Sequence, residues 1–193
     1  MFENLLQLII LFFVIFDPLA SLVIFLVSTT RLRDFEKRKV ATLAVLVAGS
    51  LSFAVLIFGN TLLTLFDTSI MDLRVAGGII LGILGLKMVL GQSLTDTEGM
   101  KADSSLAIAS IIGTPLLTGP ATITTIMIAM NDFGRLQTGI AIFVVLSLTA
   151  LIFYNAARIE KILGKTAIRV ISTILGLITL AWGVKYIRLG LGI

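Results

Sequence analysis

The sequence of 193 residues contains no cysteine and no histidine. Their absence excludes disulfide frameworks, thiolate metal sites, haem ligation and catalysis by a cysteine or histidine nucleophile. Without a nucleophile and a partner base, we expect no enzyme, and we expect no bound cofactor or metal. The first ten residues have no basic region and no small-residue cleavage pattern, so we do not expect a removed signal peptide.

Charged residues are also scarce, at 13% of the chain, whereas 58% is hydrophobic and the mean hydropathy is +1.11. Soluble domains usually carry about a quarter charged residues. Uncharged runs of 27, 28 and 22 residues cover 40–66, 104–131 and 136–157, and each exceeds the roughly 20 residues that cross a membrane as a helix. The sequence therefore predicts an integral membrane protein in contact with lipid. The net charge of +4 comes from basic residues grouped in loops, so we expect no nucleic-acid binding.

The apolar runs between charge clusters predict an all-α protein with six transmembrane helices. We expect these spans at 5–28, 40–66, 72–91, 105–130, 136–157 and 168–190. The first is one broken span in this interpretation. The alternative is a helical hairpin, but 12 or 13 residues per half are too few to cross twice. Residues 1–193 then form a single transmembrane domain.

The basic residues between the spans predict the orientation. One side carries Arg31, Arg33, Lys37, Arg38, Lys39, Lys101, Arg158, Lys161, Lys165 and Arg169. The other side carries Arg74, Arg135, Lys185 and Arg188. Because Lys and Arg are in excess on the cytoplasmic side, we expect both termini outside the cytoplasm.

The two halves of the chain also resemble each other. GIILGILGLK (78–87) and GLITLAWGVK (176–185) share two glycines and a lysine at a constant offset of 98 residues, and Asp17-Pro18 matches Gly119-Pro120 at 102. Three spans per half would give the halves opposite orientations. We therefore predict inverted repeats, a common transporter design, at about 1–95 and 105–193, with a linker at about 95–104. The glycines predict close helix packing.

The three prolines of the chain, Pro18, Pro115 and Pro120, all lie in the first and fourth predicted spans. A proline inside a helix lacks an N–H donor and clashes with the carbonyl four residues earlier. Within a membrane, the released carbonyl groups need protein, hydroxyl or water partners. Hydroxyl side chains lie close by in the sequence: Ser21, Thr114, Thr118, Thr122, Thr124 and Thr125.

Each break also has the sequence of a helix start. Asp is a favoured N-cap and Pro a favoured first residue, so we predict half-helices that begin at Pro18 and Pro120. Such starts suit a carboxylate. Asp17 partly neutralises its own helix start and is suited to an ammonium, whereas Gly119 leaves its N–H groups bare. Together they predict a site for both ends of a zwitterion. The alternative is that Asp17 only caps its helix.

Three segments then resemble one known family. DPLASLVIF, which begins at Asp17, resembles the DPLGNxPIF-type motif of the MarC family of integral membrane proteins. TPLLTGPATI (114–123) resembles its PLxAGPxxI motif, and RVAGGIILGILGLKMVLG (74–91) resembles its SGGIILxLxAxKM segment. The chain departs from the family at Ala20-Ser21, where Gly-Asn is usual, and at Val23 and Thr118, where Pro and Ala are usual.

The resemblance implies a six-helix, multi-pass protein of the prokaryotic inner membrane. It also implies transport, because the family includes the small neutral amino acid transporters called SnatA, which couple glycine or alanine to a cation gradient. The hypothesis is a secondary transporter with a small zwitterionic substrate, H⁺ or Na⁺ as coupling ion, and alternating access of the two halves. The predicted substrate-binding residues are Asp17, Pro18, Ala20, Ser21, Thr114, Pro115, Thr118, Gly119, Pro120, Ala121 and Thr122.

Other functions stay open at this point. They are an exporter or exchanger of another small solute, a passive channel, and a structural or signalling membrane protein. A homo-oligomer is also compatible with the sequence.

Overall fold

The computed structural model describes residues 2–92 and 105–193, and every regular element in these two ranges is helical. The elements are α1 (Phe2–Phe16), α2 (Pro18–Ser28), α3 (Asp34–Leu65), α4 (Ile70–Val89), α5 (Ser105–Ile111), the π-helical turn η1 (Ile112–Leu117), α6 (Pro120–Phe133), α7 (Arg135–Tyr154) and α8 (Ala156–Leu191). The predicted all-α class is confirmed for this part of the chain. The predicted linker at about 95–104 lies outside the described residues.

Four segments in the described ranges are long and apolar enough to cross a membrane: Glu3–Ser28, Asp34–Leu65, Arg135–Tyr154 and Thr166–Leu191. The other two predicted spans differ for separate reasons. α4 carries three charged residues, Asp72, Arg74 and Lys87, within its 20 residues, which is more charge than a membrane-spanning helix usually carries. The span predicted at 105–130 is divided into α5, η1 and α6, each of them short. The chain is an integral membrane protein with several apolar helices.

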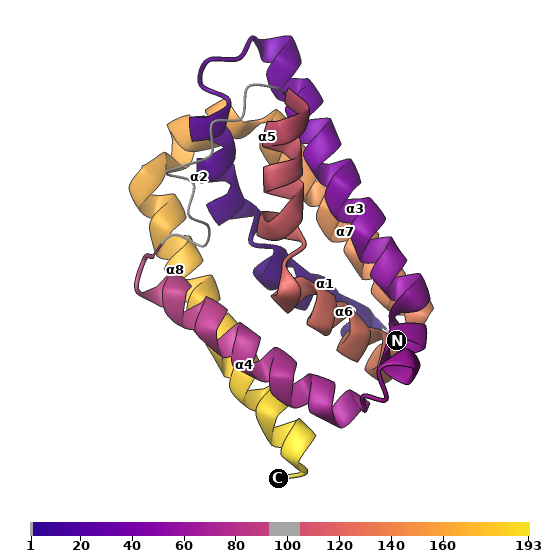
Figure 1. Cartoon of the computed structure of the whole chain (residues 1–193). Helices are drawn as coiled ribbons and strands as arrows, with labels where there is room; N and C mark the ends of the chain where they lie inside the picture. Colours follow the sequence, from indigo (N-terminus) through magenta and orange to yellow (C-terminus); the bar gives the residue numbers. More distant parts are fainter. Residues whose placement is uncertain (1, 93–104) are drawn as a thin grey trace.

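The two broken helices occupy the centre of the molecule (Figure 1). α1 and α2 form one of them, α5, η1 and α6 form the other, and the two run in opposite directions. α3 packs antiparallel to α7 on one side, and α4 packs antiparallel to α8 on the other. The apolar part of Glu3–Ser28 is 61% buried, against 33%, 39% and 28% for the other three candidate spans. The first break is thus enclosed by protein, where irregular backbone at membrane depth is tolerated.

Apolar side chains at helical spacing hold the broken helices in place. Leu8, Phe12 and Phe16 recur every four residues along α1, which puts them on one face, and all three are fully buried. On α2, Phe25 stacks on Phe153 of α7 with the ring centroids 4.9 Å apart. α2 is therefore fixed to α7 by aromatic packing.

Glycines bring α4 and α8 into backbone contact. A Cβ atom added to Gly78 would lie 2.6 Å from the carbonyl oxygen of Gly183, and one added to Gly85 would lie 2.7 Å from that of Gly176. Larger side chains would push the helices apart, so the predicted close packing at these glycines is confirmed. Gly82 differs, because a Cβ added there meets nothing within 4 Å.

Two helices extend beyond the apolar runs that predicted them. The sequence predicts a loop between 157 and 168, but α8 begins at Ala156 and is interrupted only at Gly164 (φ 71°, ψ 159°). That prediction is wrong because AARIEKIL (156–163) consists mostly of good helix formers, and charged side chains fit a helix at a membrane surface. α3 likewise begins at Asp34, where acidic residues in the first turn favour the helix start.

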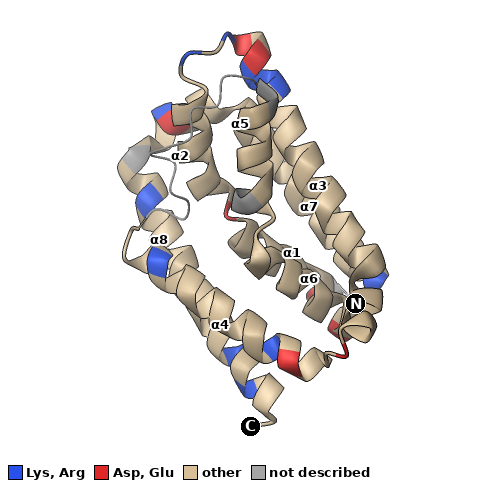
Figure 2. Cartoon of the chain, viewed as in Figure 1, with Lys and Arg blue, Asp and Glu red and all other residues tan. Residues whose placement is uncertain are grey.

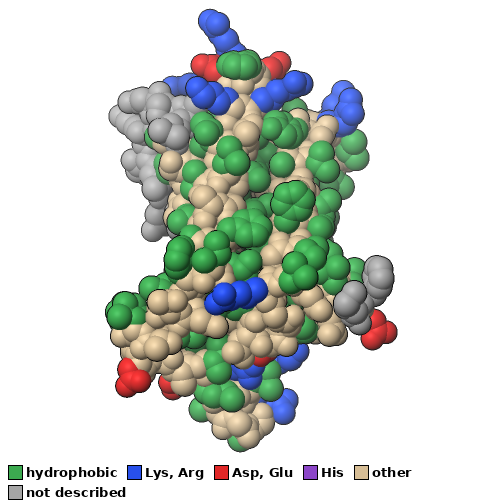
Figure 3. Space-filling model, turned by 90° about the vertical axis from the view of Figure 1, so that its right-hand side faces the viewer, with side chains coloured by type: hydrophobic (Ala, Val, Ile, Leu, Met, Phe, Trp, Pro, Cys, Tyr) green, Lys and Arg blue, Asp and Glu red, His purple; other side chains and the backbone are tan. Residues whose placement is uncertain are grey.

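The outer surface has the distribution of a membrane protein. Figure 2 shows that charged residues gather mainly toward the ends of the molecule. On the face that α3 and α7 form, hydrophobic side chains cover the middle, and charged side chains lie mainly at the top and in the lower part (Figure 3). α3 and α7 expose large apolar residues such as Phe58 and Phe143. This surface suits lipid rather than water.

Candidate functional site

The first break lies at Asp17. α1 ends at Phe16 and α2 begins at Pro18, with Asp17 between them in the left-handed region (φ 37°, ψ 66°). Among residues other than glycine, Asp and Asn adopt this region most readily. The Oδ1 atom of Asp17 accepts a hydrogen bond from the backbone N–H of Ala20 at 3.2 Å. The half-helix predicted to begin at Pro18 is confirmed, and Asp17 is its N-cap.

The cap uses only one carboxylate oxygen of Asp17. The Oδ2 atom has no hydrogen-bond partner, although the residue is only 3% exposed. A charged group at the centre of a membrane helix costs about 2.5–3.5 kcal/mol on insertion scales. An uncharged Asn or Ser would cap the helix as well. Capping therefore explains Oδ1 and leaves the buried Oδ2 unexplained.

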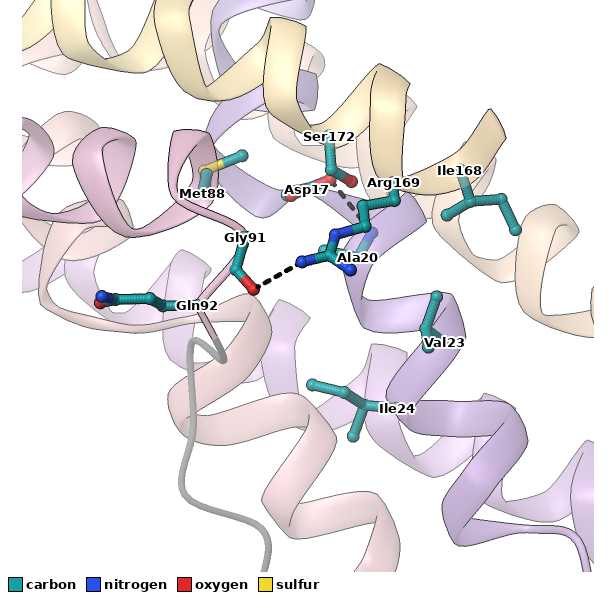
Figure 4. Close-up of a pocket in the computed structure, with 10 residues that line it drawn as sticks. All are labelled: Asp17, Ala20, Val23, Ile24, Met88, Gly91, Gln92, Ile168, Arg169 and Ser172. Atoms are coloured by element: carbon teal, nitrogen blue, oxygen red, sulfur yellow. Dashed lines mark hydrogen bonds between the residues drawn. The ribbon is translucent and has the colours of Figure 1, made fainter. Parts of the chain in front are cut away.

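Asp17 lies in the wall of a cavity of about 400 Å³ between α2, the end of α4 and α8 (Figure 4). The described residues that line it are Asp17, Ala20, Val23, Ile24, Met88, Gly91, Gln92, Ile168, Arg169 and Ser172. Asp17 is the one acidic side chain among them. Within 2–92 and 105–193, no three acidic side chains are grouped closely enough to hold a metal ion. The cavity thus offers a single carboxylate rather than a metal cage.

Two polar groups of α8 lie in the same cavity. The Oγ atom of Ser172 is buried without a hydrogen-bond partner, and the Nη2 atom of Arg169 donates to the Gly91 carbonyl at 3.4 Å. The sequence predicts Arg169 in a cytoplasmic loop and indicates no role for Ser172. Their spacing of three residues puts both on one helix face, but nothing in the sequence places that face against Asp17.

The second break lies between η1 and α6. α6 begins at Pro120, and its N-cap Gly119 has an extended backbone (φ −77°, ψ 180°) without a side-chain cap. The half-helix predicted to begin at Pro120 is confirmed. Thr114 departs from helical geometry (φ −143°, ψ 122°) and is exposed, whereas Ala121 is buried. The side chain of Pro115 lies outside the described residues.

Threonine hydroxyls satisfy backbone carbonyl groups around the second break. The Thr118 hydroxyl donates to the Gly113 carbonyl, which also accepts the Thr118 N–H at 3.2 Å. The Thr122 hydroxyl donates to the Leu117 carbonyl at 2.9 Å. Both threonines are buried. Their hydroxyl groups thus stabilise the irregular backbone, as expected of hydroxyls near breaks in membrane helices.

The structure unites only part of the predicted site in one cavity. Asp17 and Ala20 line the cavity, while Pro18 and Ser21 are buried in the first turn of α2. None of the residues 114–122 is among the described residues of the cavity wall. α2 does contact η1, so the two breaks are neighbours. The described cavity, however, lies on the side of α2 that faces α8.

An ion pair joins α4 to α6 near the start of α4, whereas the cavity lies at the end of α4. The guanidinium of Arg74 donates to the carboxylate of Asp132, and the two side chains are 13% and 27% exposed. One turn further along α4, a Cβ added to Gly77 would lie 3.1 Å from the hydroxyl oxygen of Thr124 on α6. α4 and α6 are therefore tightly packed here, whereas α2 and α8 enclose a cavity.

Broken central helices, apolar outer helices and a buried acid at a helix break define a multi-pass α-helical membrane protein with a polar site in its centre. The chain belongs to the MarC family, because the model of the MarC family integral membrane proteins matches residues 2–192. The family resemblance seen in the three motifs is thereby confirmed.

Relatives in bacteria and archaea match nearly the whole chain. UPF0056 membrane protein YvbG of Bacillus subtilis (strain 168) is 34% identical, over 99% of this chain and 95% of its own. UPF0056 membrane protein MJ1677 of Methanocaldococcus jannaschii is 31% identical, over 93% of this chain and 91% of its own. UPF0056 membrane protein YhcE of Escherichia coli (strain K12) is 27% identical over 93% and 87%. No solved structure matches the chain. These names describe membrane proteins and state no substrate.

Proposed function

We propose that the protein is a secondary transporter of small neutral amino acids of the glycine and alanine class, coupled to H⁺ or Na⁺. The observation that carries this proposal is the partnerless Oδ2 atom of Asp17 in a cavity at the break of a central helix. An ionisable group at membrane depth marks a substrate or ion path. Helix breaks near the membrane midplane are where secondary transporters bind both.

The size and lining of the cavity support a small substrate. Its volume of about 400 Å³ is near the lower end of the roughly 300–1,000 Å³ typical of ligand pockets. Val23, Ile24 and Met88 contribute apolar wall, which suits a short, uncharged side chain.

The contacts between α4 and α8 support two inverted repeats. In the proposed repeat, Gly78 is equivalent to Gly176, and Gly85 is equivalent to Gly183. In space, Gly78 meets Gly183 and Gly85 meets Gly176. A two-fold axis produces this reciprocal pattern. The same axis would relate α3 to α7, and the broken α1–α2 to the broken α5–η1–α6 (Figure 1).

In this proposal the chain is one domain of six spans in the inner membrane, with repeats at about 1–95 and 105–193. α4 and the α5–η1–α6 segment are the two spans beyond the four apolar candidates. The basic residues of 29–39 and 156–169 would face the cytoplasm, which leaves both termini outside. The cavity beside Asp17 then opens toward the cytoplasm, since its wall includes the end of α4 and the part of α8 near Arg169.

The difference between the two sides supports alternating access. Arg74 and Ser172 are equivalent at the same offset of 98 residues. Arg74 pairs with Asp132 and closes α4 against α6, while Ser172 borders the cavity between α8 and α2. The arrangement corresponds to a transporter that is open to the cytoplasm and closed to the outside.

Counterflow in liposomes tests the proposed function. Vesicles that contain the purified protein and unlabelled alanine should transiently accumulate radiolabelled alanine or glycine, with saturable rates, and an imposed H⁺ or Na⁺ gradient should increase uptake. A passive channel would give unsaturated flux without counterflow. Counterflow only with other solutes would indicate a different exchanger. No uptake or exchange of any small amino acid by folded protein refutes the proposal.

A further inference from the structure

Three polar side chains point into the cavity between α2 and α8 (Figure 4). Asp17 comes from the helix break, and Arg169 and Ser172 come from successive turns of α8. Apart from Gln92, the other described side chains of the wall are apolar. The cavity therefore contains an acid, a base and a hydroxyl within an otherwise apolar lining.

These groups keep unused hydrogen-bonding capacity. The Oδ2 atom of Asp17 and the Oγ atom of Ser172 are both buried without a partner. The guanidinium of Arg169 has five N–H donors, and its hydrogen bond in the described part of the chain is a long one to the Gly91 carbonyl. Buried polar atoms are normally hydrogen-bonded. The two buried oxygens without a partner therefore indicate a missing ligand, and the exposed guanidinium of Arg169 borders the same cavity with donors available to that ligand.

The acid and the base of the cavity do not neutralise each other. The ion pairs among the described residues are those of Lys37 with Asp34 and of Arg74 with Asp132. Asp17 and Arg169 thus line the same space with opposite charges and without direct contact. A ligand with one charge of each sign would satisfy both, whereas a lone cation or anion would satisfy one.

We propose that Arg169 binds the carboxylate and Asp17 the ammonium group of a zwitterionic amino acid, with Ser172 as a second acceptor for the ammonium. Guanidinium matches the planar, two-oxygen geometry of a carboxylate, and the partnerless Oδ2 atom is the ammonium acceptor. This assignment rests on the proposed function and replaces the bare N–H groups at Gly119 as the carboxylate site. The apolar wall at Ile24 and Ile168 would contact the substrate side chain.

Ligands that lack one charged end test this assignment. The affinities of the purified protein for L-alanine, L-alaninamide and propionate are measured by calorimetry. Alaninamide keeps the ammonium and lacks the carboxylate, whereas propionate has the reverse. Because each end makes a charge-assisted hydrogen bond, wild-type protein should bind alanine at least about tenfold more tightly than either analogue.

Variants then assign each end to a residue. Arg169→Gln should lower the affinity for alanine about tenfold or more and leave the affinity for alaninamide unchanged. It should thereby abolish the preference for alanine over alaninamide. Arg169→Lys keeps the charge and should restore part of that preference. Ser172→Ala should lower the affinities for alanine and alaninamide equally, by about two- to tenfold, and leave the affinity for propionate unchanged. Arg158→Gln removes an exposed arginine of the same helix and should change none of these affinities.

The outcomes separate the site from the function. Wild type could bind alanine while Arg169→Gln lowers the affinities for alanine and alaninamide alike. Arg169 would then have a structural role, and the assignment would be overturned while the transporter proposal stands. The same holds if wild type binds propionate or alaninamide as tightly as alanine. If wild type binds neither alanine nor glycine, both the assignment and the proposed function are refuted. The wild-type comparison needs no variant to fold.

Discussion

Replacing one glycine on α4 tests the contact that underlies the proposed two-fold arrangement. Gly82 and Gly85 lie three residues apart on the same helix, but only Gly85 faces the backbone of α8. A Cβ at Gly85 would lie 2.6 Å from the Leu180 nitrogen and 2.7 Å from the Gly176 oxygen, whereas a Cβ at Gly82 meets nothing within 4 Å. Gly82→Ala is therefore a matched control for Gly85→Ala.

The expected magnitude follows from these distances. Ordinary contacts lie at about 3.5–4.0 Å, so α4 and α8 must separate by about 1 Å at Gly85. Such overpacking costs about 1–3 kcal/mol. Both substitutions gain about the same 1 kcal/mol in helix propensity, and this gain cancels when the two variants are compared. Gly85→Ala should therefore be about 1–3 kcal/mol less stable than Gly82→Ala.

Thermal unfolding of the purified variants in one detergent measures this difference. With about 2–4 °C per kcal/mol for a chain of this length, Gly85→Ala should melt about 2–12 °C below Gly82→Ala. Gly183→Ala should lower the stability about as much as Gly85→Ala, since its Cβ would lie 2.7 Å from the Gly78 carbonyl oxygen. The double variant should cost less than the sum, because one separation of the helices relieves both clashes. Equal melting of Gly82→Ala and Gly85→Ala would refute the backbone contact.

Two further predictions concern the α4–α6 contact and the second break. Arg74→Gln removes the ion pair and should open the contact between α4 and α6. Ile128 is buried, and Ile128→Cys would introduce the one cysteine of the chain. In the Arg74→Gln background this cysteine should react about tenfold faster with an impermeant maleimide added outside than it does with Arg74 present. Asp67→Asn, at an exposed turn, is the control, and an unchanged rate would contradict this role of Arg74. Thr118→Val should lower the free energy of unfolding by about 1 kcal/mol, because it removes a buried hydroxyl that donates to a carbonyl. Ser147→Ala, at an exposed site, should change it by less than about 0.5 kcal/mol, and equal melting of the two variants would argue against a structural hydroxyl at Thr118.

Both helix breaks could be predicted because local chemistry determines them. An acid followed by proline, or a glycine followed by proline, favours a helix start through its local chemistry. α2 begins at Pro18 and α6 at Pro120, as these rules require. The close packing at Gly78 and Gly85 was predictable for a similar reason, since small residues let the backbones of membrane helices approach each other closely.

The composition of the cavity could not be predicted, because it depends on which helix faces lie together. Arg169 and Ser172 meet Asp17 only through the packing of α8 against α2. The pair of Arg74 and Asp132 likewise joins residues that are remote in the sequence. Charge was also an unreliable signal for loops. The basic segment 156–163 is helical, since its residues favour helix and its charges reach water from a helix at the membrane surface.

The central claim is that Asp17 does more than cap α2, and one paired measurement on Asp17→Asn tests it most directly. Asn retains an oxygen for the Ala20 N–H and tolerates the left-handed backbone of this position, but it removes the buried charge. Alanine counterflow and the melting temperature are measured on the same preparation, with Asp17→Ala as the variant that loses the cap at a cost of about 1 kcal/mol. We predict at least about a tenfold loss of counterflow in Asp17→Asn, with a melting temperature equal to or above that of wild type. Full counterflow in Asp17→Asn at unchanged stability would show that Asp17 only caps its helix, and would contradict the account.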